Sequence, residues 1–342
     1  MKNPDRPRRA TIEDVAREAG VSVATVSRAI RGLPNVAVAT RLRVRRAAEH
    51  LDYQADAIAA RLASGHTMSI ALIAPFFGEW HTSVTLAGIE DVLVESGYDL
   101  LITSSGSADA GPDFIGTARS LESRVDGLLT VDLYHNHEKD TVAGSLSLPV
   151  VTIGEHLAGH SSLTIPNTAA SREATEHLIS LGHRRIALMT SATRGGSPVP
   201  ELRQQGYELA MTEAGLEIDS HLIVDGRFSI DGGREATDQL LGLAEPPTAV
   251  FCLSDLMAFG ALQSCRQAGL RVPHDLSIVG FDDHEVAGSL GLTTMRQPVR
   301  DIGARAAQLL LERLGSADQA VYHEEARIGL VVRSSTARPN RG

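Results

Sequence analysis

Residues 11–30 read TIEDVAREAGVSVATVSRAI, and this stretch predicts two short helices joined by a tight turn. Thr11 is a favoured N-cap residue, and Asp14 stands three residues later in capping-box spacing. Gly20 permits the left-handed turn that ends the first helix, and Ser22 can cap the second. Two helices connected in this way form a helix-turn-helix.

A third amphipathic helix is expected from Ala39 to Leu51. Its apolar positions include Val44 and Ala47, while arginines occupy its remaining faces at positions 41, 43, 45 and 46. The three helices predict a small all-α domain over residues 1–53. From the helix pattern alone, a three-helix bundle with no DNA function remains an alternative.

The formal net charge of the 342-residue chain is −10, but it is distributed unevenly. Residues 1–65 carry 12 basic and seven acidic side chains, a charge of +5, and the remainder carries −15. This asymmetry predicts a basic module that meets a polyanion and an acidic body that does not. A solvated basic tail is the simpler alternative that charge alone leaves open.

The composition is that of a globular protein, with 43% hydrophobic and 22% charged residues. The length predicts two or three packed units. No apolar run approaches the ~20 residues that a membrane span needs, and the basic N-terminus lacks the apolar segment of a secretory signal. Two cysteines cannot form a disulfide framework, so we expect a cytoplasmic protein.

The opening stretch, followed by Thr40-Arg41 and Tyr53, resembles the lactose-repressor/galactose-repressor (LacI/GalR) family of transcription regulators. The resemblance implies that Arg28 reads bases, and an arginine can contact guanine O6 and N7 together. Val23 and Ala24 match the other base-reading positions and can touch a thymine methyl. The resemblance also implies phosphate or sugar contacts, which position the protein without specifying sequence, from Thr11, Ser22, Thr25, Ser27 and Arg31.

Residues 54–65 match the family's hinge helix, which is ordered when two copies pair over DNA. The resemblance places Leu62 at the leucine that wedges into the minor groove at the centre of the operator. Simple dimer or core packing is the alternative role for Leu62. The family usually has proline where Ala55 stands, so the start of this helix is less fixed here.

In the rest of the chain, short apolar runs alternate with amphipathic stretches, which predicts parallel sheets covered by helices. The expected strands are Ser69–Ala74, Asp99–Thr103, Gly127–Val131, Val150–Ile153, Ile186–Thr190, Ala249–Leu253 and Ser277–Gly280. The expected helices are Leu86–Ser96, Ala169–Leu181, Leu202–Ala214, Gly233–Leu241, Met257–Ala268 and Val299–Leu314.

The resemblance extends over this body, in GHRRIA at 182–187, SDLMAFGA at 254–261, IVGFDD at 278–283 and LTTMRQP at 292–298. It implies the fold of periplasmic sugar-binding proteins, an α/β core of two doubly wound parallel-sheet subdomains. We expect an N-subdomain at about 66–165 and 298–332 and a C-subdomain at about 166–297, together spanning 66–342. Final strands near Ala320–His323 and Arg327–Val332 are expected to complete the N-subdomain.

Ligands of such sheets bind beyond the carboxyl ends of the strands. The resemblance implies an effector-binding set drawn from both subdomains: Trp80, His81, Arg203, Phe228, Ser254 and Asp282. A surface or salt-bridge role for Arg203 and a core role for Phe228 are alternatives. Two departures from the family change the site: Ser254 replaces the usual asparagine, and Pro166-Asn167 stands where Asp-Asn is common.

Other chemistry is weakly indicated. The segment His135-Asn-His137-Glu138 suggests metal, but its spacing is not the helical His-Glu-x-x-His pattern and it follows a strand as a polar loop. Cys252 lies in an apolar strand pattern and is expected to be a small hydrophobe. Asp255 is expected to cap the following helix.

The sequence contains no Walker, Gly-x-Gly-x-x-Gly or Gly-x-Ser-x-Gly motif. We therefore expect no enzyme and no cofactor or metal. A sugar-binding receptor without DNA function is the alternative, but the recognition helix opposes it. The expected protein is a homodimeric repressor of a pseudo-palindromic DNA operator, controlled by a carbohydrate-like or nucleoside-like effector, with no membrane partner.

Overall fold

The computed structural model describes residues 10–30, 36–53, 66–74, 79–104, 114–132, 146–191, 197–316 and 320–340. The chain divides into two compact units, Met1–Thr67 and Met68–Gly342. The expected hinge helix with Leu62, the phosphate contact Arg31 and the His135–Glu138 segment lie outside the described residues.

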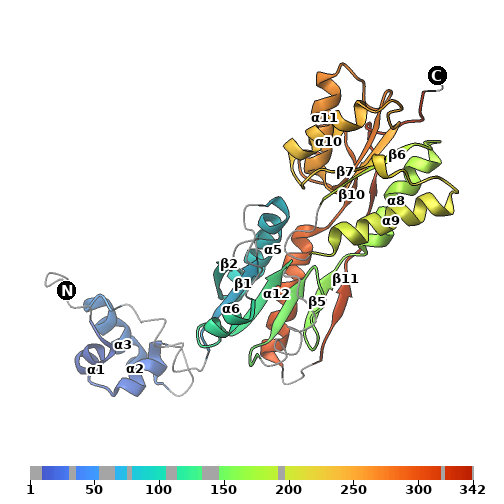
Figure 1. Ribbon diagram of the computed structural model, residues 1–342. Coiled ribbons are helices and arrows are strands. Elements are labelled where there is room, and N and C mark those ends of the chain that lie inside the picture. The colour runs from blue at the N-terminus through green and yellow to red at the C-terminus, as the bar shows by residue number, and fades with distance from the viewer. Residues whose placement is uncertain are drawn as a thin grey trace, which may run out of the picture. The chain divides into compact units, whose positions relative to one another are not determined.

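The described residues of the first unit form three helices, α1 (Ile12–Ala19), α2 (Val23–Ile30) and α3 (Val38–His50) (Figure 1). The predicted cap of α1 is confirmed, because the Thr11 side chain accepts from the Asp14 N–H and the Asp14 carboxylate accepts from the Thr11 N–H. Gly20 ends α1 with φ +66°. One valine from each helix, at positions 15, 26 and 44, is buried in the shared core. The helix-turn-helix is therefore held by a core of its own.

The first lobe of the second unit is a six-stranded parallel sheet in the order β11-β5-β4-β3-β1-β2. Its strands are β1 (Ser69–Ala74), β2 (Asp99–Ser104), β3 (Gly127–Val131), β4 (Val150–Ile153), β5 (Ser161–Thr164) and β11 (His323–Glu325). Helices α5 (Trp80–Ser96) and α12 (Val299–Gly315) pack together, and α6 (Phe114–Leu121) belongs to a separate core cluster. The sheet is thus covered by two apolar cores.

The second lobe is a six-stranded sheet in the order β12-β10-β9-β8-β6-β7. Its strands are β6 (Ile186–Thr190), β7 (Ile223–Asp225), β8 (Ala249–Cys252), β9 (Ser277–Asp282), β10 (Thr293–Arg296) and β12 (Gly329–Val331). Helices α8 (Asn167–Ser180) and α9 (Val199–Glu213) lie on one side of it in Figure 1, and α10 (Ile230–Leu241) and α11 (Asp255–Gln267) lie on the other. A 3₁₀ turn, Ser220–Leu222, precedes β7.

The chain passes between the two sheets three times, after β5, after β10 and after β11. Both final strands were expected to complete the first lobe, and this is wrong for the last one. Strand β11 joins the first sheet, but β12 pairs antiparallel with β10 of the second, with Met295 opposite Leu330. The sequence missed this third crossing because a three-residue strand carries no local mark of its pairing partner.

Four further helices and strands were not predicted: α6, β5, β7 and β10. The three strands have only three or four residues each, and β5 and β10 are rich in serine or threonine, so none shows the apolar run that marks a buried strand. The mixed second sheet is otherwise parallel, and the expected α/β architecture of two doubly wound lobes is confirmed.

Candidate functional site

The helix-turn-helix presents one side of α2 to solvent. Val26 and Ala29 of α2 are buried, whereas Val23, Ala24 and Arg28 are exposed on its other side. Val23 is 41% exposed. The three residues that the resemblance assigned to base reading therefore share an accessible surface.

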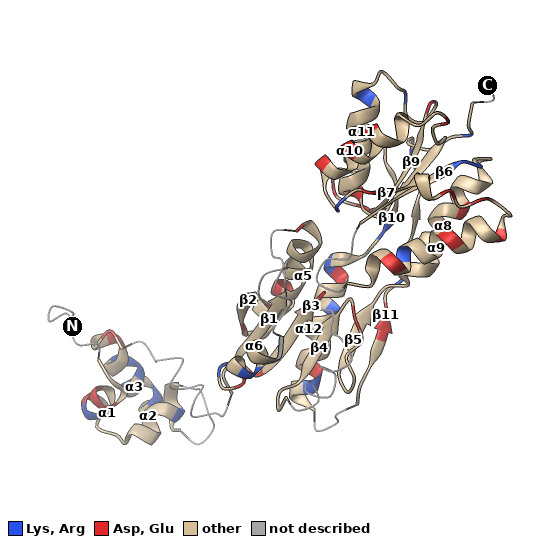
Figure 2. Cartoon of the chain, in the orientation of Figure 1, with Lys and Arg blue, Asp and Glu red and all other residues tan. Residues whose placement is uncertain are grey.

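The hydroxyls near this surface are partly engaged within the domain. The Ser22 Oγ accepts from the Thr25 N–H at 3.2 Å and lies 2.9 Å from the Thr25 Oγ1. Thr11 is committed to its cap, and Ser27 is half-buried. Basic side chains occur on α2 and α3 (Figure 2), with those of Arg43, Arg45 and Arg46 exposed. The first unit thus combines an exposed surface of apolar and arginine side chains with positive charge beside it.

In the second lobe, Arg203 of α9 is buried, with 6% of its surface exposed. Its Nε donates to the Asn167 Oδ1 at 2.8 Å, and its Nη1 donates to the Leu253 carbonyl at 2.6 Å. The guanidinium carbon lies 3.6 Å from the ring centroid of Phe281, a cation–π contact. Arg203 is therefore a buried, oriented cation, and the surface role weighed for it is wrong.

Asp282 ends β9, and its backbone has φ +130°, a conformation that L residues rarely adopt. Its Oδ1 accepts from the Gln297 Nε2 at 2.6 Å. Burial raises the pKa of Asp282, although the positive charges of Arg203 and His81 and the Gln297 hydrogen bond oppose that shift. The carboxyl group is thus held at the carboxyl end of β9, as the sheet-edge argument predicted.

His81 comes from the first lobe, in the first turn of α5, and its Nδ1 lies 3.4 Å from the Asp132 Oδ2 after β3. Burial lowers the pKa of His81, but the hydrogen bond and charge of Asp132, with the charge of Asp282, raise it above 6.5 overall. Arg203 opposes this rise. Asp282 and Arg203 belong to the second lobe, so the charges that affect the pKa of His81 come from both lobes.

The remaining expected residues occupy different positions. Phe228 has φ +46° and packs against the core of the second lobe while half-buried, so it contributes to that core. The Ser254 hydroxyl accepts from the Met257 N–H and caps α11. Trp80 contacts the second lobe, where its Nε1 donates to the Glu285 Oε2 at 2.9 Å.

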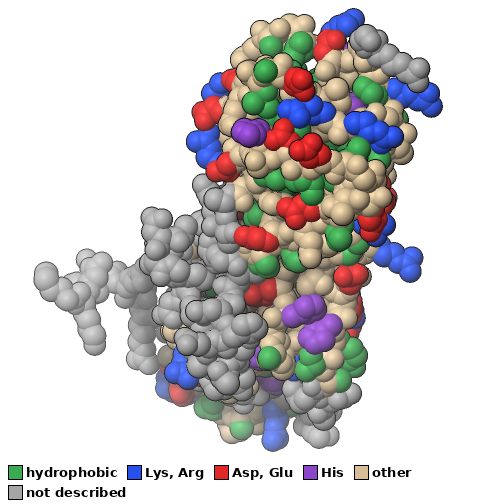
Figure 3. All heavy atoms as spheres, turned by 45° about the vertical axis from the view of Figure 1, so that its right-hand side comes forward, with side chains coloured by type: hydrophobic (Ala, Val, Ile, Leu, Met, Phe, Trp, Pro, Cys, Tyr) green, Lys and Arg blue, Asp and Glu red, His purple; other side chains and the backbone are tan. Residues whose placement is uncertain are grey.

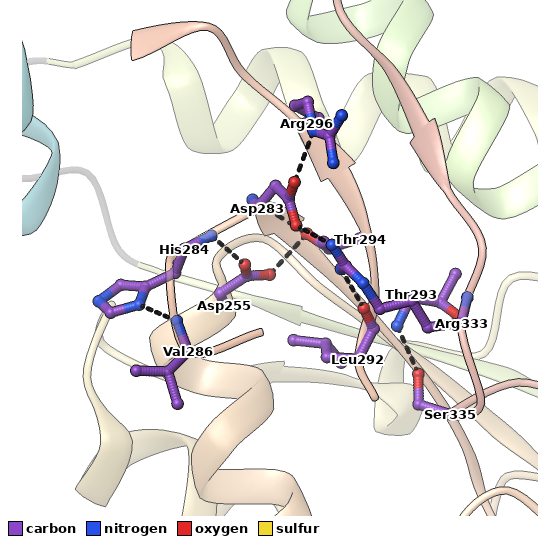
Figure 4. Close-up of polar contacts among 10 residues, drawn as sticks. All are labelled: Asp255, Asp283, His284, Val286, Leu292, Thr293, Thr294, Arg296, Arg333 and Ser335. Carbon is purple, nitrogen blue, oxygen red and sulfur yellow. Dashed lines mark hydrogen bonds and ion pairs between the residues drawn. The ribbon is translucent and has the colours of Figure 1, made fainter. Parts of the chain in front are cut away.

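Asp255 was expected to cap α11, but the cap is Ser254. Asp255 is instead the first helical residue and is fully buried, accepting from the His284 N–H at 2.8 Å and the Thr294 hydroxyl at 2.6 Å (Figure 4). Burial raises its pKa to about 7, and the charge of Asp282 adds to the rise. This carboxyl group ties the start of α11 to the loop after β9 and to β10.

A second carboxylate in Figure 4 joins the loop after β9 to two strand ends. Asp283 accepts from Arg296 at the end of β10 and from Arg333 beyond β12, each at 2.6 Å. Burial favours the neutral form of Asp283, but these two hydrogen-bonded arginines hold its pKa below the usual range. Asp283 therefore clamps the loop that carries Asp282 to chain segments beside two of the crossovers.

Sequence reasoning missed several residues that hold the site, namely Asp132, Asn167, Asp283 and Gln297. Signals existed for some of them. Asp132 directly follows an apolar strand. Asn167 belongs to the Pro166-Asn167 pair, and Gln297 belongs to the LTTMRQP motif at 292–298. Their roles depend on contacts with partners that local pattern does not reveal.

The thiol of Cys252 is buried, and burial raises its pKa, which agrees with its expected role as a small hydrophobe. Among the described residues, no group of three metal-ligating side chains comes together. In that same part of the chain, no helix is long and apolar enough to cross a membrane.

Comparisons with known proteins cover nearly the whole chain. It is 34% identical over 305 residues to "Catabolite control protein A" of Priestia megaterium, spanning 88% of this chain and 91% of that protein. The chain belongs to the lacI family of bacterial regulatory proteins. A second lacI-family relative, "HTH-type transcriptional repressor PurR" of Vibrio atlanticus (strain LGP32), is 32% identical over 337 residues, covering 97% of this chain and all of the relative.

Family models match residues in each of the two units. The profile of the lacI regulatory proteins matches residues 11–56, and the periplasmic binding protein-like domain matches residues 175–336. A lac repressor dimer bound to operator and the anti-inducer ONPF superposes with a TM-score of 0.85 at 27% identity, over 96% of this chain and all of that one. The "transcriptional regulator CelR-cellobiose complex" gives a TM-score of 0.68 at 32% identity, with the same coverage.

Proposed function

We propose that this lacI-family protein is a homodimeric transcriptional repressor whose affinity for a pseudo-palindromic operator is set by a small molecule bound between the two lobes. The observation that carries the proposal is the presence, in one chain, of an exposed surface on α2 and of an Arg203–Asp282–His81 set drawn from both lobes, in which Arg203 is buried. Relatives named as HTH-type transcriptional repressors support it. Because its target is DNA, we place the protein in the cytoplasm.

On the operator, Arg28 reads guanine, while Val23 and Ala24 contact thymine methyl groups. Thr11, Ser22, Thr25, Ser27 and Arg31 supply phosphate or sugar contacts. We assign the role of the family's hinge to residues 54–65, with Leu62 as the residue that wedges between base pairs at the centre of the site. The charge of −15 outside residues 1–65 repels phosphate and leaves docking to the basic unit.

The surface of the second unit agrees with this division of labour. On the face in Figure 3, acidic and basic side chains are interspersed, without a continuous basic patch. This face therefore offers no continuous basic surface to a phosphate backbone.

The effector site combines donors and acceptors suited to a polyol. Arg203 donates through its guanidinium, Asp282 accepts, and the His81–Asp132 pair adds polar groups from the opposite lobe. The CelR regulator in complex with cellobiose and a LacI-family regulator with bound ribose, both similar in structure to this chain, support a carbohydrate-like or nucleoside-like effector. Phe228 offers an aromatic face and Ser254 a hydroxyl near the end of β8.

The two sites communicate through the angle between the lobes, because the effector set spans them. Such coupling between two sites is typically worth about 1–3 kcal/mol and is reciprocal. Operator DNA must therefore change the effector affinity by the same factor by which effector changes operator affinity.

The test begins with selection of operator duplexes from a random pool by the full chain. Deleting residues 1–65 is expected to abolish binding to the selected duplex, and retention of binding by the deleted protein would refute the role of the first unit. A thermal-shift screen of sugars and nucleosides then identifies an effector, since a ligand at 100 times its Kd stabilises by about 2.7 kcal/mol. Equal effector affinity with and without the operator would refute the allosteric link.

A further inference from the structure

Trp80 and His81 are consecutive residues in the first turn of α5, yet they contact different partners. Successive helical residues point in directions about 100° apart, so two neighbours can face different partners. His81 pairs with Asp132 within its own lobe, whereas Trp80 reaches the loop after β9 in the other lobe. The first turn of α5 therefore supplies one residue, His81, to the proposed effector site and another, Trp80, to a contact between the lobes.

The contact made by Trp80 has both a polar and an aromatic component. Its Nε1 donates to the Glu285 Oε2 at 2.9 Å, across 205 residues of sequence. Its ring stacks on His284 with centroids 4.8 Å apart and an interplanar angle of 29°. His284 in turn meets the ring of Phe259 on α11 edge-on, at 5.4 Å and 88°. Three rings thus run from the first lobe into the second.

The His284 side of this contact is held by hydrogen bonds within the second lobe. The His284 N–H donates to the buried Asp255, and the Val286 N–H donates to the His284 Nδ1 at 3.1 Å (Figure 4). Because Nδ1 accepts, the proton of a neutral His284 ring is on Nε2. Asp283 is clamped by its two arginines. An oriented ring and carboxylate therefore stand two and three residues after Asp282.

We propose that Trp80 is a latch residue: its indole, held by Glu285 and His284, keeps the two lobes in contact and so retains the effector without touching it. The role in retention rests on the proposed function, and the lobe contact itself does not. This inference replaces the expectation that Trp80 binds the effector. It assigns Glu285 and His284, which no motif had singled out, to the regulation of the site.

The contact is measurable without any ligand, because Trp80 is the only tryptophan of the chain. In the full-length protein, Glu285→Ala and His284→Ala are each expected to shift the tryptophan emission to the red and to increase its quenching by acrylamide. Glu217→Ala removes another exposed carboxylate of the same lobe and is the matched control. Emission and quenching that are identical in wild type and both latch variants would overturn the proposal.

Retention is tested by calorimetry with ribose and cellobiose as the first probes. Losing one hydrogen bond weakens the closed state and is expected to raise the apparent Kd about three- to tenfold in Glu285→Ala. Trp80→Phe, which keeps a ring but lacks the Nε1 donor, is expected to match it. Loss of binding in Trp80→Phe alone would mean that the indole contacts the sugar and would overturn the latch.

Unchanged sugar binding in Glu285→Ala and Trp80→Phe, with altered tryptophan quenching in Glu285→Ala, would overturn the retention role. If neither sugar binds the wild type, the carbohydrate effector of the proposed function fails instead. The fluorescence comparison then decides the lobe contact by itself.

Discussion

Asn167 offers a direct test of how the buried cation of the effector site is held. Asn167 is the first residue of α8, only 8% exposed, and its Oδ1 accepts from the Arg203 Nε at 2.8 Å. Asn167→Ala deletes this acceptor. Hydrogen bonds to charged groups are worth about 1.5–3 kcal/mol, so we expect a loss of about 2 kcal/mol in the free energy of unfolding.

Asn167→Asp is the matched variant. It keeps an oxygen acceptor, makes the hydrogen bond charge-assisted, and places a negative charge at the N-terminus of a helix. We expect this variant to be at least as stable as the wild type. The two substitutions at one position therefore have opposite predicted signs.

The measurement is urea and thermal unfolding of the full chain, followed by circular dichroism at equal protein concentration. A loss of about 2 kcal/mol corresponds to a fall in Tm of about 3–4 °C for a unit of this size. Affinity for an effector found in the thermal-shift screen should fall in Asn167→Ala and persist in Asn167→Asp. Stability of Asn167→Ala within experimental error of wild type, or equal damage by both substitutions, would refute the assigned role of the Asn167 oxygen.

Three other outcomes are expected. Arg28→Ala should relax base preference, whereas Arg31→Ala should weaken binding on all sequences and flatten its salt dependence; equal losses on every sequence from both changes would contradict this assignment. Burial lowers the pKa of His183 below 6.5 in the folded protein. As the pH falls below 6.5, the unfolded chain therefore binds this proton more readily than the folded chain, and the free energy of unfolding decreases. His183→Gln should reduce that slope in urea titrations at pH 5.5–7.5, and an unchanged slope would count against it. Gly88→Ala, whose Cβ would overlap a backbone oxygen of α12, should cost about 1–3 kcal/mol or more, while Gly315→Ala in that helix has open space and should cost nothing.

The elements that sequence predicted most accurately are those whose signals are local. The bounds of α1 and α2 were predicted to the residue, because caps and a left-handed glycine act within a single turn. Four strands, β1, β3, β4 and β6, were also predicted to the residue, because each is a short apolar run that is buried along its length. The starts of α5, α8, α9, α10 and α11 were set two to six residues too late, whereas the start of α12 at Val299 was predicted correctly.

The effector site was predicted less completely. Resemblance to a family indicated Arg203 and Asp282, but the side chains that orient them come from elsewhere. Asn167 lies 36 residues from Arg203, and Gln297 lies 15 residues from Asp282. No periodicity or cap links residues at those separations, so their pairing follows from the order of strands and the packing of α8 against α9.

By itself, the sequence determined the helix-turn-helix, the alternation of strands and helices, and the separation of charge into +5 and −15 segments. These properties depend on residues within a few positions of one another or on simple sums along the chain. Only the tertiary structure placed β12 in the second sheet and turned Trp80 toward Glu285. Both depend on contacts between distant segments, which exist only after the chain has crossed between its two sheets and the lobes have packed.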